Sequence, residues 1–599
     1  MTVSTLDLRA IIEPHNLATS IANMFMEWNG LRAGWLTEKS ELRDYIFATD
    51  TTKTGNKFLP WKNSTTLPKL CQIRDNLHAN YMAALFPNDE WLSWEGEDRD
   101  AVTKDKATVI EAFMYNKTRA SDFKTTVSRL VYDWIDYGNC FATVDFIDES
   151  THDSNGIVIP GYQGPKLYRV SPFDIVFNPA SSDFVRTPKI VRTVKSLGQL
   201  KKELDKNPED REAQAIFNRA IEVRNGLKGV VDGQVHKDHG FQIDGFSSFS
   251  HYFSSGMVEI LTFYGDMFDI ETNTLYENHI ITVIDRSYIL AKKTNPSWIG
   301  SDNFFHHGWR LRPDNLYAMG PLDNLVGMQY RIDHLENLKA DAFDMIAFPM
   351  LKIIGEVQEF NYGPNERIHC GDEGDVQFMH PDASALAADN QIAILEAKME
   401  QMAGAPKEAM GIRTPGEKTA FEVQSLQNAS SRMFESKTLS FEGDFLAKIL
   451  NSMLEVGRRK MSTPELIKSL DSDIDVVVFQ TVSAEDLKAS GKIRPVGASH
   501  FAKQARLIQN LVQLLNGPVG RDPSINVHLS GKQIAKMVED ILELERFELF
   551  GENVRVIEQM ETQRLMQEGS EQLQVESMTP PGTVPGDQAS AAPNITAIR

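Results

Sequence analysis

The chain opens with helical periodicity and then changes to strand alternation. Apolar residues recur three and four positions apart over residues 67–87 and 121–139, and each run ends at a proline or glycine. From Cys140 the pattern alternates and is rich in β-branched and aromatic residues, which predicts a strand over 140–148. Further strands are expected in three later stretches, 166–179, 258–268 and 279–293. The first three hundred or so residues therefore indicate an α+β domain.

A long polar helix is expected next. Pro321 stands at its first position, and helical periodicity continues to Phe348, where Pro349 ends it. At 1.5 Å per residue the helix would be about 40 Å long. Charged residues interrupt its apolar stripe, which consists of Leu322, Leu325, Val326, Ile332, Leu335 and Leu338. A helix this polar should be exposed to solvent on one side or packed beside copies of itself.

A small β module is expected after this helix, because two apolar runs flank the turn-rich residues 361–366. A return helix follows over 382–405, and then a loop with Gly and Pro over 406–418. Thr419 and Glu422 have capping-box spacing and mark the start of a very long helix, 419–460. Its expected buried face consists of Val423, Leu426, Phe434, Phe441, Phe445, Ile449 and Met453.

The remaining chain returns to β structure over 473–487 and then to helices. Residues 577–599 are rich in Pro, Ala, Ser and Gly and lack aromatic residues, so this tail is expected to be disordered. No internal repeat is visible. A length of 599 residues exceeds the roughly 250–300 that one hydrophobic core holds, so more than one domain is expected.

Charge and cysteine content narrow the functional classes. The balance of 62 Lys+Arg against 83 Asp+Glu gives a net charge of -21, which disfavours tight non-specific DNA binding but leaves local basic patches open. Three scattered cysteines make no disulfide framework and favour a reducing compartment. There is no secretory signal and no run of about 18 apolar residues, so we expect a protein that is made and kept in the cytoplasm and has no membrane partner.

Sequence motifs for catalysis are missing. The chain has no GxxxxGK[ST], GxGxxG or GxSxG string. His369, Cys370 and His380 lie close together, but a zinc site needs further ligands, and polar turns around one buried thiol are the preferred interpretation. We therefore expect no enzyme, cofactor or metal. A packaging ATPase or nuclease, the alternative of a different class, would need a phosphate loop or clustered metal-binding carboxylates.

The order of elements and four short strings together resemble the portal proteins of tailed bacteriophages, most closely those of short-tailed phages. The strings are Tyr137–Phe141, Val170–Ile175, Gly320–Leu322 and Gly416–Val423. The last is similar to the family's sequence where the tunnel loop meets the tunnel helix. The resemblance covers nearly all of the chain before the tail. The runner-up is another head–tail connector or collar protein of a virion, although adaptors are usually far shorter.

The resemblance implies a mainly helical, multi-domain portal fold with a specific division of the chain. The expected parts are a wing (1–319), a stem helix (320–348), a clip (349–381), a second stem helix (382–405), a tunnel loop (406–418), a tunnel helix (419–460), a wing return (461–525), crown helices (526–576) and the disordered tail (577–599).

The resemblance also implies function and partners. Family members form a ring, usually of twelve subunits, at one capsid vertex of the virion, and double-stranded DNA enters and leaves through it. The expected partners are terminase, a tail adaptor, and the major capsid and scaffold proteins. The tunnel-loop residues expected at the DNA are Arg413, Thr414, Pro415, Gly416, Glu417 and Lys418, with Arg413 and Lys418 nearest. The expected clip interface consists of Gln358, Phe360, Asn361, Tyr362, Asn365 and Arg367.

Overall fold

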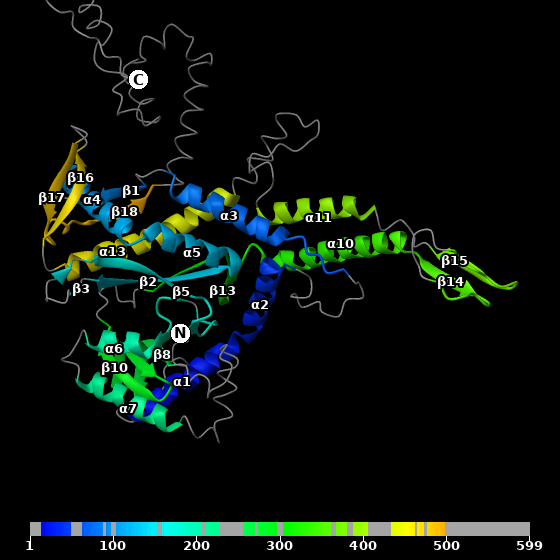
Figure 1. Ribbon diagram of the computed structural model, residues 1–599. Helices are drawn as coiled ribbons and strands as arrows, with labels where there is room; N and C mark the ends of the chain where they lie inside the picture. Colours follow the sequence, from blue (N-terminus) through cyan, green and yellow to red (C-terminus); the bar gives the residue numbers. More distant parts are fainter. Residues whose placement is uncertain are drawn as a thin grey trace, which may run out of the picture. The chain divides into compact units, whose positions relative to one another are not determined.

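The protein is an α+β molecule, about half helical with several small antiparallel sheets (Figure 1). It divides into two units, residues 1–500 and 501–599. The computed structural model describes parts of the first unit, namely residues 14–49, 63–87, 91–97, 104–149, 151–152, 158–159, 161–181, 183–205, 211–227, 256–269, 274–295, 304–360, 367–379, 387–404, 433–461, 464–471 and 476–496. The α+β expectation is confirmed. The crown and tail segments lie outside the described residues.

The largest hydrophobic core joins helices to a three-stranded antiparallel sheet. The sheet has the order β11-β2-β5, and the principal helices around it carry apolar residues at helical spacing. Trp134, Trp309 and Phe441 are fully buried there. The elements are α3 (Lys69–Leu85), α4 (Lys104–Ala120), α5 (Phe123–Asp136), β2 (Asn139–Asp148), β5 (Gln163–Val170), β11 (Phe304–Gly308) and α13 (Ala447–Lys460). The helices expected over 67–87 and 121–139 and the strand over 140–148 are therefore confirmed.

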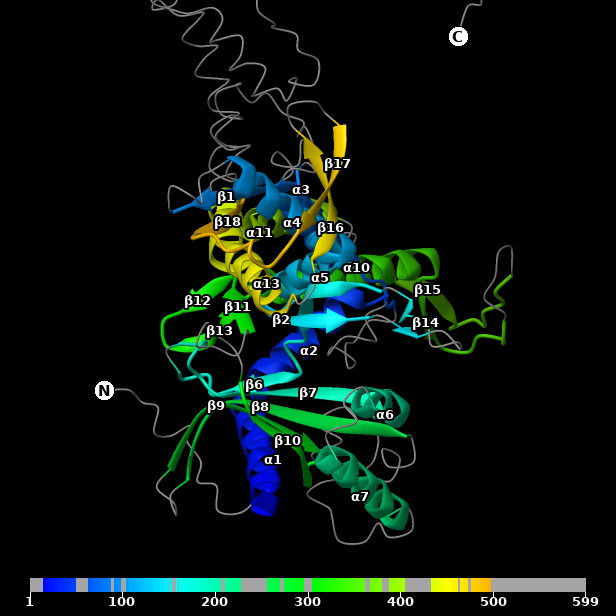
Figure 2. The ribbon, with the colours of Figure 1, turned by 90° about the vertical axis from the view of Figure 1, so that its left-hand side faces the viewer.

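A second, five-stranded antiparallel sheet has helices on both faces (Figure 2). Residues along β8 alternate between the two faces, as a strand requires: Leu261 and Phe263 pack with α1, whereas Val258 and Ile260 pack with α6 and α7. The strand order is β10-β9-β8-β7-β6. The elements are α1 (Pro14–Leu31), β6 (Ile175–Phe177), β7 (Lys189–Ser196), α6 (Leu197–Asp205), α7 (Arg211–Leu227), β8 (Met257–Asp269), β9 (Thr274–Ile284) and β10 (Tyr288–Thr294).

The single strand expected over 279–293 is wrong, because the chain reverses in its middle. Asp285 and Arg286 both have positive φ angles, 48° and 55°, and the amide of Ser287 donates to the carbonyl of Ile284 at 3.1 Å. Such a turn favours Gly or Asn, so the sequence gives little sign of it. Buried ion pairs accompany it instead: Arg286 pairs with Glu259 at 2.7 Å, and Asp285 pairs with Arg224 at 3.0 Å.

The long helix begins with a short 3₁₀ turn, η3 (Asp323–Leu325), and continues as α10 (Val326–Ala347). Two strands follow, β14 (Met350–Ile354) and β15 (Asp375–Met379), which pair antiparallel from Met350 opposite Met379 to Ile354 opposite Asp375. The return helix α11 (Ala388–Ala403) then packs along α10 (Figure 1). The long helix, β module and return helix expected from the sequence are therefore confirmed as elements.

The very long helix is described from residue 433. Residues 433–440 are α-helical, a π-helical segment η5 (Phe441–Leu446) follows, and α13 completes the run. Four expected core residues, Phe441, Phe445, Ile449 and Met453, are fully buried. The π segment was not expected, since the spacing of these residues suits a continuous α-helix. Thr419, Glu422, Val423 and Leu426 lie outside the described residues.

Small antiparallel pairs complete the fold. β16 (Glu465–Asp471) pairs with β17 (Val476–Val482), which confirms β structure after the long helix. The other pairs are β1 (Leu92–Gly96) with β18 (Gly491–Pro495), β3 (Thr151–His152) with β4 (Val158–Ile159), and β12 (Arg310–Arg312) with β13 (Asn315–Met319). No helix within the described ranges combines the length and apolar character needed to cross a bilayer.

Candidate functional site

Three of the strings that carry the portal resemblance meet at the entry to α10. Phe141 pairs with Val170 across β2 and β5. Gly138, with φ of +70°, lies directly against Gly320, so a Cβ at position 138 would overlap the backbone of Met319 and Gly320. A Cβ at Gly320 would in turn lie 2.9 Å from the carbonyl oxygen of Ile135. Both glycines are therefore required by close backbone approach.

Asn139 fastens this junction with its side chain. Its Nδ2 donates to the carbonyls of Tyr137 and Ala318, both at 3.0 Å, and its Oδ1 accepts from the amide of Ala318 at 2.9 Å. Nε2 of His306 lies 3.0 Å from the same Oδ1. Asn139 is fully buried, and each bond satisfies a polar group that would otherwise be costly to bury. The residue that follows α5 is thus joined through one amide to β13, the strand that leads into α10.

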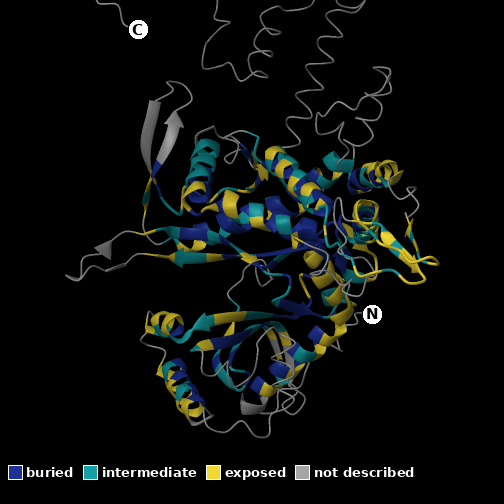
Figure 3. Cartoon of the chain, turned by 45° about the vertical axis from the view of Figure 1, so that its right-hand side comes forward, coloured by how far each residue is buried: buried dark blue, intermediate teal, exposed yellow. Residues whose placement is uncertain are grey.

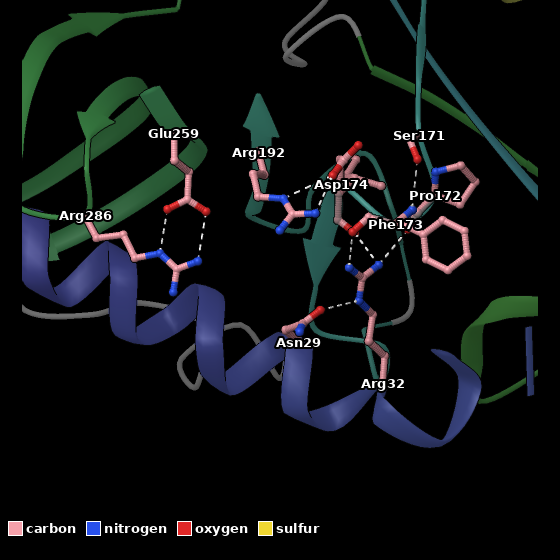
Figure 4. Close-up of polar contacts among 10 residues, drawn as sticks. Asn29, Arg32, Ser171, Pro172, Phe173, Asp174, Arg192, Glu259 and Arg286 are labelled. Carbon is pink, nitrogen blue, oxygen red and sulfur yellow. Dashed lines mark hydrogen bonds and ion pairs between the residues drawn. The ribbon is translucent and has the colours of Figure 1, made fainter. Parts of the chain in front are cut away.

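Arg32 binds the string Val170–Ile175 (Figure 4). It lies at the break between α1 and α2 (Ala33–Phe47), and its guanidinium donates to the carbonyls of Pro172, Phe173 and Ile175 at 2.6–2.7 Å. Its Nε also donates to Asn29 at 3.1 Å. A guanidinium offers five donors in a fixed plane, which suits a turn that presents several carbonyls. Arg32 therefore ties the bent N-terminal helices to the strand turn at 172–175.

The first turn of α10 is fixed by an ion pair. Lys39 of α2 pairs with Asp323, whose other carboxylate oxygen accepts from the amide of Gly320 at 2.8 Å. Burial lowers the pKa of Lys39, while Asp323 acts in the opposite direction. Asp323 therefore links the glycine junction to α2 and orients α10 as it leaves the body.

The β14–β15 hairpin is apolar yet exposed (Figure 3). Beyond the paired strands, Gly355 turns the chain with φ of +75°, and the ladder resumes at a bridge between Val357 and Cys370. Side chains that a core would normally bury are open to solvent here and at the end of α10. Their exposed fractions are Phe343 52%, Phe348 71%, Met350 57%, Ile353 53%, Phe378 50% and Met379 51%.

The expected clip residues belong partly to this hairpin. Gln358 and Arg367 are exposed and Phe360 is partly buried. The amide of Gln358 donates to the carbonyl of His369 at 3.1 Å, so Gln358 lies in the hairpin ladder. Asn361, Tyr362 and Asn365 lie outside the described residues, as do all six expected tunnel-loop residues, Arg413, Thr414, Pro415, Gly416, Glu417 and Lys418.

The expectation of a buried thiol near His369 is wrong, since Cys370 is exposed at the surface of the hairpin. His380 lies outside the described residues. Within the described parts of the chain, no group of three or more His, Cys, Asp or Glu residues could hold a metal ion. The arrangement described so far is a closely packed helix root at Gly138 and Gly320 and an exposed apolar hairpin.

His307 of β11 lies where the long helix packs against the three-stranded sheet and α5. It is buried against the rings of Phe441, Phe445 and Trp134. Burial lowers its pKa to about 4, and Lys437 and Lys448 add to that effect while Asp444 opposes it. Lys437 donates to the carbonyl of Trp309. The first described turns of the long helix are therefore held by one partly buried cation contact and an aromatic cluster.

Arg32 and Asp323 lie outside the strings that carry the resemblance, whereas Asn139 lies within one of them, Tyr137–Phe141. Arg32, Asn139 and Asp323 act through partners that are distant in the sequence, between roughly 140 and 285 positions away. Glycine at 138 and 320 was visible within the quoted strings, but their contact was not. Comparison with known proteins gave no match to a protein-family model and none to a curated protein.

Proposed function

We propose that the chain is the portal subunit of a tailed bacteriophage. The observation that carries the proposal is the order of elements: an α+β body, then α10, the β14–β15 hairpin, α11, the long helix over 433–460 and a β return. This is the order of wing, stem, clip, stem, tunnel helix and wing in the family that the sequence resembles. Further support comes from three of the strings that carry the resemblance, which lie together near the start of α10, the helix proposed as the first stem helix.

Exposed apolar residues on the hairpin support assembly. A two-stranded hairpin is at best marginally stable alone, and clustered exposed apolar side chains usually mark protein interfaces. The hairpin has four such exposed apolar side chains, namely Met350, Ile353, Phe378 and Met379. In a ring they would be covered by neighbouring subunits or by an adaptor, which explains why the stem ends in an apolar hairpin.

The proposed ring has twelve subunits and occupies one capsid vertex, with the major capsid and scaffold proteins around it. Terminase and later the tail adaptor would bind the clip, and double-stranded DNA would pass through the channel past Arg413 and Lys418. No hydrolysis is assigned to the chain. A net charge of -21 suits a channel through which DNA must slide, because strong phosphate contacts would retain it.

Negative-stain microscopy of the purified full-length chain tests the proposal. We expect rings with a central hole and a rotational symmetry near twelve. A monodisperse monomer at micromolar concentration, especially one that hydrolyses ATP, would overturn it. Incorporation of one ring per shell, when the chain is produced with its capsid and scaffold proteins, would distinguish a portal from a head–tail adaptor.

A further inference from the structure

One face of α10 binds the backbone of an extended segment, residues 63–68, which precedes α3. Asn337 accepts from the amide of Thr65 at 2.8 Å and donates to the carbonyl of the same residue at 2.9 Å. Asp333 accepts from the amide of Leu67 at 3.0 Å. Asp341, four residues beyond Asn337, accepts from the amide of Asn63 at 3.0 Å.

The fourth position of this row is Gln329. Its Oε1 accepts from the amide of Leu70 at 3.2 Å, and its Nε2 donates to the carbonyl of Leu67. Polar side chains at 329, 333, 337 and 341 therefore hydrogen-bond to backbone groups between 63 and 70. We call residues 63–68 the strap.

The spacing explains the match. Four residues of α-helix rise about 6 Å, and two residues of extended chain advance about 6.6 Å, so each step along α10 meets every second residue of the strap. The side chains take the place of a neighbouring strand and pair with backbone groups of the strap, whose residues are partly buried or exposed. The sequence predicted that the polar face of α10 is exposed to solvent or packed beside another copy. The strap of the same chain covers part of this face.

Asp333 differs from the other three residues of the row. It is 3% exposed, and its Oδ1 accepts from Leu67 and from Nε2 of Gln329 at 2.9 Å. Its Oδ2 is buried with no hydrogen-bond partner among the described residues. Burial raises the pKa of Asp333 to about 7, although these hydrogen bonds act in the opposite direction.

Cations on the neighbouring elements are already engaged. Three lysines around α10 form ion pairs. Lys39 of α2 pairs with Asp323, Lys69 of α3 pairs with Glu400 of α11, and Lys339 of α10 pairs with Asp389 of α11. Arg331 and His334 also belong to α10 and interact with each other electrostatically. None of these groups contributes to the pKa shift of Asp333. A negative charge on Asp333 is therefore uncompensated where the strap crosses α10.

We propose that the strap is a reversible latch between α3 and α10. The stability of its closed form depends on whether Asp333 carries a proton. The neutral acid keeps its two accepted hydrogen bonds and avoids a buried charge. Ionisation places that charge beneath Leu67 and favours the open strap, in which water reaches the carboxylate. The latch concerns only described residues of one chain and does not depend on the proposed function.

The sign of the pH dependence follows from linkage. In the closed strap the pKa of Asp333 is raised, whereas in the open strap it should approach the ordinary value of about 4. The closed form therefore binds the proton more tightly, and it loses stability as pH rises from about 4 to about 7. Above pH 7 both forms are ionised, and no further change is expected from this group.

Hydrogen exchange of the full-length chain, followed by mass spectrometry over residues 63–70, tests the latch. After correction for the intrinsic exchange rate, protection should fall by up to about tenfold per pH unit between pH 5 and 7 and level off above 7.5. Asp333→Asn keeps an oxygen acceptor without the charge, so its protection should not change over this range. Asp341→Asn, at the partly exposed end of the row, should retain the wild-type profile.

Two results would overturn the proposal. One is an identical pH profile in the wild type and in Asp333→Asn. The other is a strap whose amides are unprotected at pH 5 while peptides from β8 and β9 are protected in the same sample, which would show that the ladder does not form in solution.

Discussion

At the scale of single residues, the contact between Gly138 and Gly320 makes a sharp prediction. Gly138→Ala places a Cβ into the backbone of Met319 and Gly320 and imposes a left-handed φ on a residue that avoids it. We expect a loss of roughly 2–4 kcal/mol of stability, measured as a lower Tm. Gly327→Ala is the matched control, because that glycine lies on α10 with nothing within 4 Å of its Cβ position. It should stabilise the helix by about 0.5–1 kcal/mol. Equal effects of the two variants would contradict the close approach.

A second residue-scale prediction concerns His307, whose pKa is about 4 in the fold. The unfolded chain takes up a proton on this ring below pH 6.5, whereas the folded chain does so only near pH 4. His307 therefore contributes stability above pH 6.5 that is lost as pH falls toward 4, by about 1.4 kcal/mol per pH unit.

His307→Gln removes this contribution without adding a charge. Asp333 has the opposite sign over a similar range, so the quantity to measure is the difference in Tm between variant and wild type at each pH. The variant should be less stable at pH 7.5 and approach or exceed the wild type by pH 4.5. A constant difference across that range would show that the ring is not buried as a neutral group.

At the scale of elements, the β9–β10 hairpin depends on the ion pair between Glu259 and Arg286. Nε and Nη2 of Arg286 donate to the two carboxylate oxygens at 2.7 and 2.8 Å, and both side chains are nearly inaccessible. Arg286→Leu removes the bidentate partner of a buried carboxylate and should cost about 3–5 kcal/mol.

The double variant Glu259→Leu with Arg286→Leu tests the cause of that loss. Removing both charges should recover much of the stability, because well-packed apolar residues often replace a buried pair at little cost. Thermal unfolding followed by circular dichroism gives the comparison. A double variant as unstable as Arg286→Leu would assign the loss to turn geometry, since Arg286 also has a positive φ.

The approximate positions of helices and strands were predictable where hydrophobic periodicity alone determines them. They were not predictable where tertiary contacts determine them. The helices at 69–85 and 123–136 and the strand at 139–148 follow from periodicity alone. The π segment at 441–446 does not, because Phe441, Phe445 and Ile449 have the same spacing in either helix type. The reversal at Asp285 was missed because its turn residues are charged and its partners, Arg224 and Glu259, are distant in sequence.

At the scale of the whole molecule, the sequence indicated which elements exist but not which segments meet. Gln329, Asp333, Asn337 and Asp341 stand four positions apart, a spacing that can be seen in the sequence. Their partner, the strap, has no periodicity because it is recognised through its backbone. The candidate site was predictable to the same degree: the β module was found from two apolar runs, whereas its exposure depends on what the remaining chain leaves uncovered.

The last prediction joins the exposed hairpin to assembly. Phe378 is half exposed on β15, so a change to Glu removes no core contact of the single chain and should leave its Tm nearly unchanged. In a ring the same position would be buried between subunits, and a charge there would be desolvated without a partner. We therefore expect Phe378→Glu to remain folded but to lose rings in negative-stain images and to shift to monomer mass in light scattering.

Gln377→Glu is the matched control, since it adds the same charge at the neighbouring exposed position, on the opposite face of the strand. It should form rings like the wild type. If both variants assemble normally, the apolar hairpin is not a subunit contact, and a partner such as the adaptor would have to cover it. If both fail, net charge at the tip rather than the apolar face controls assembly. Loss in Phe378→Glu alone would assign the contact to the apolar face of β15, because only that face was changed.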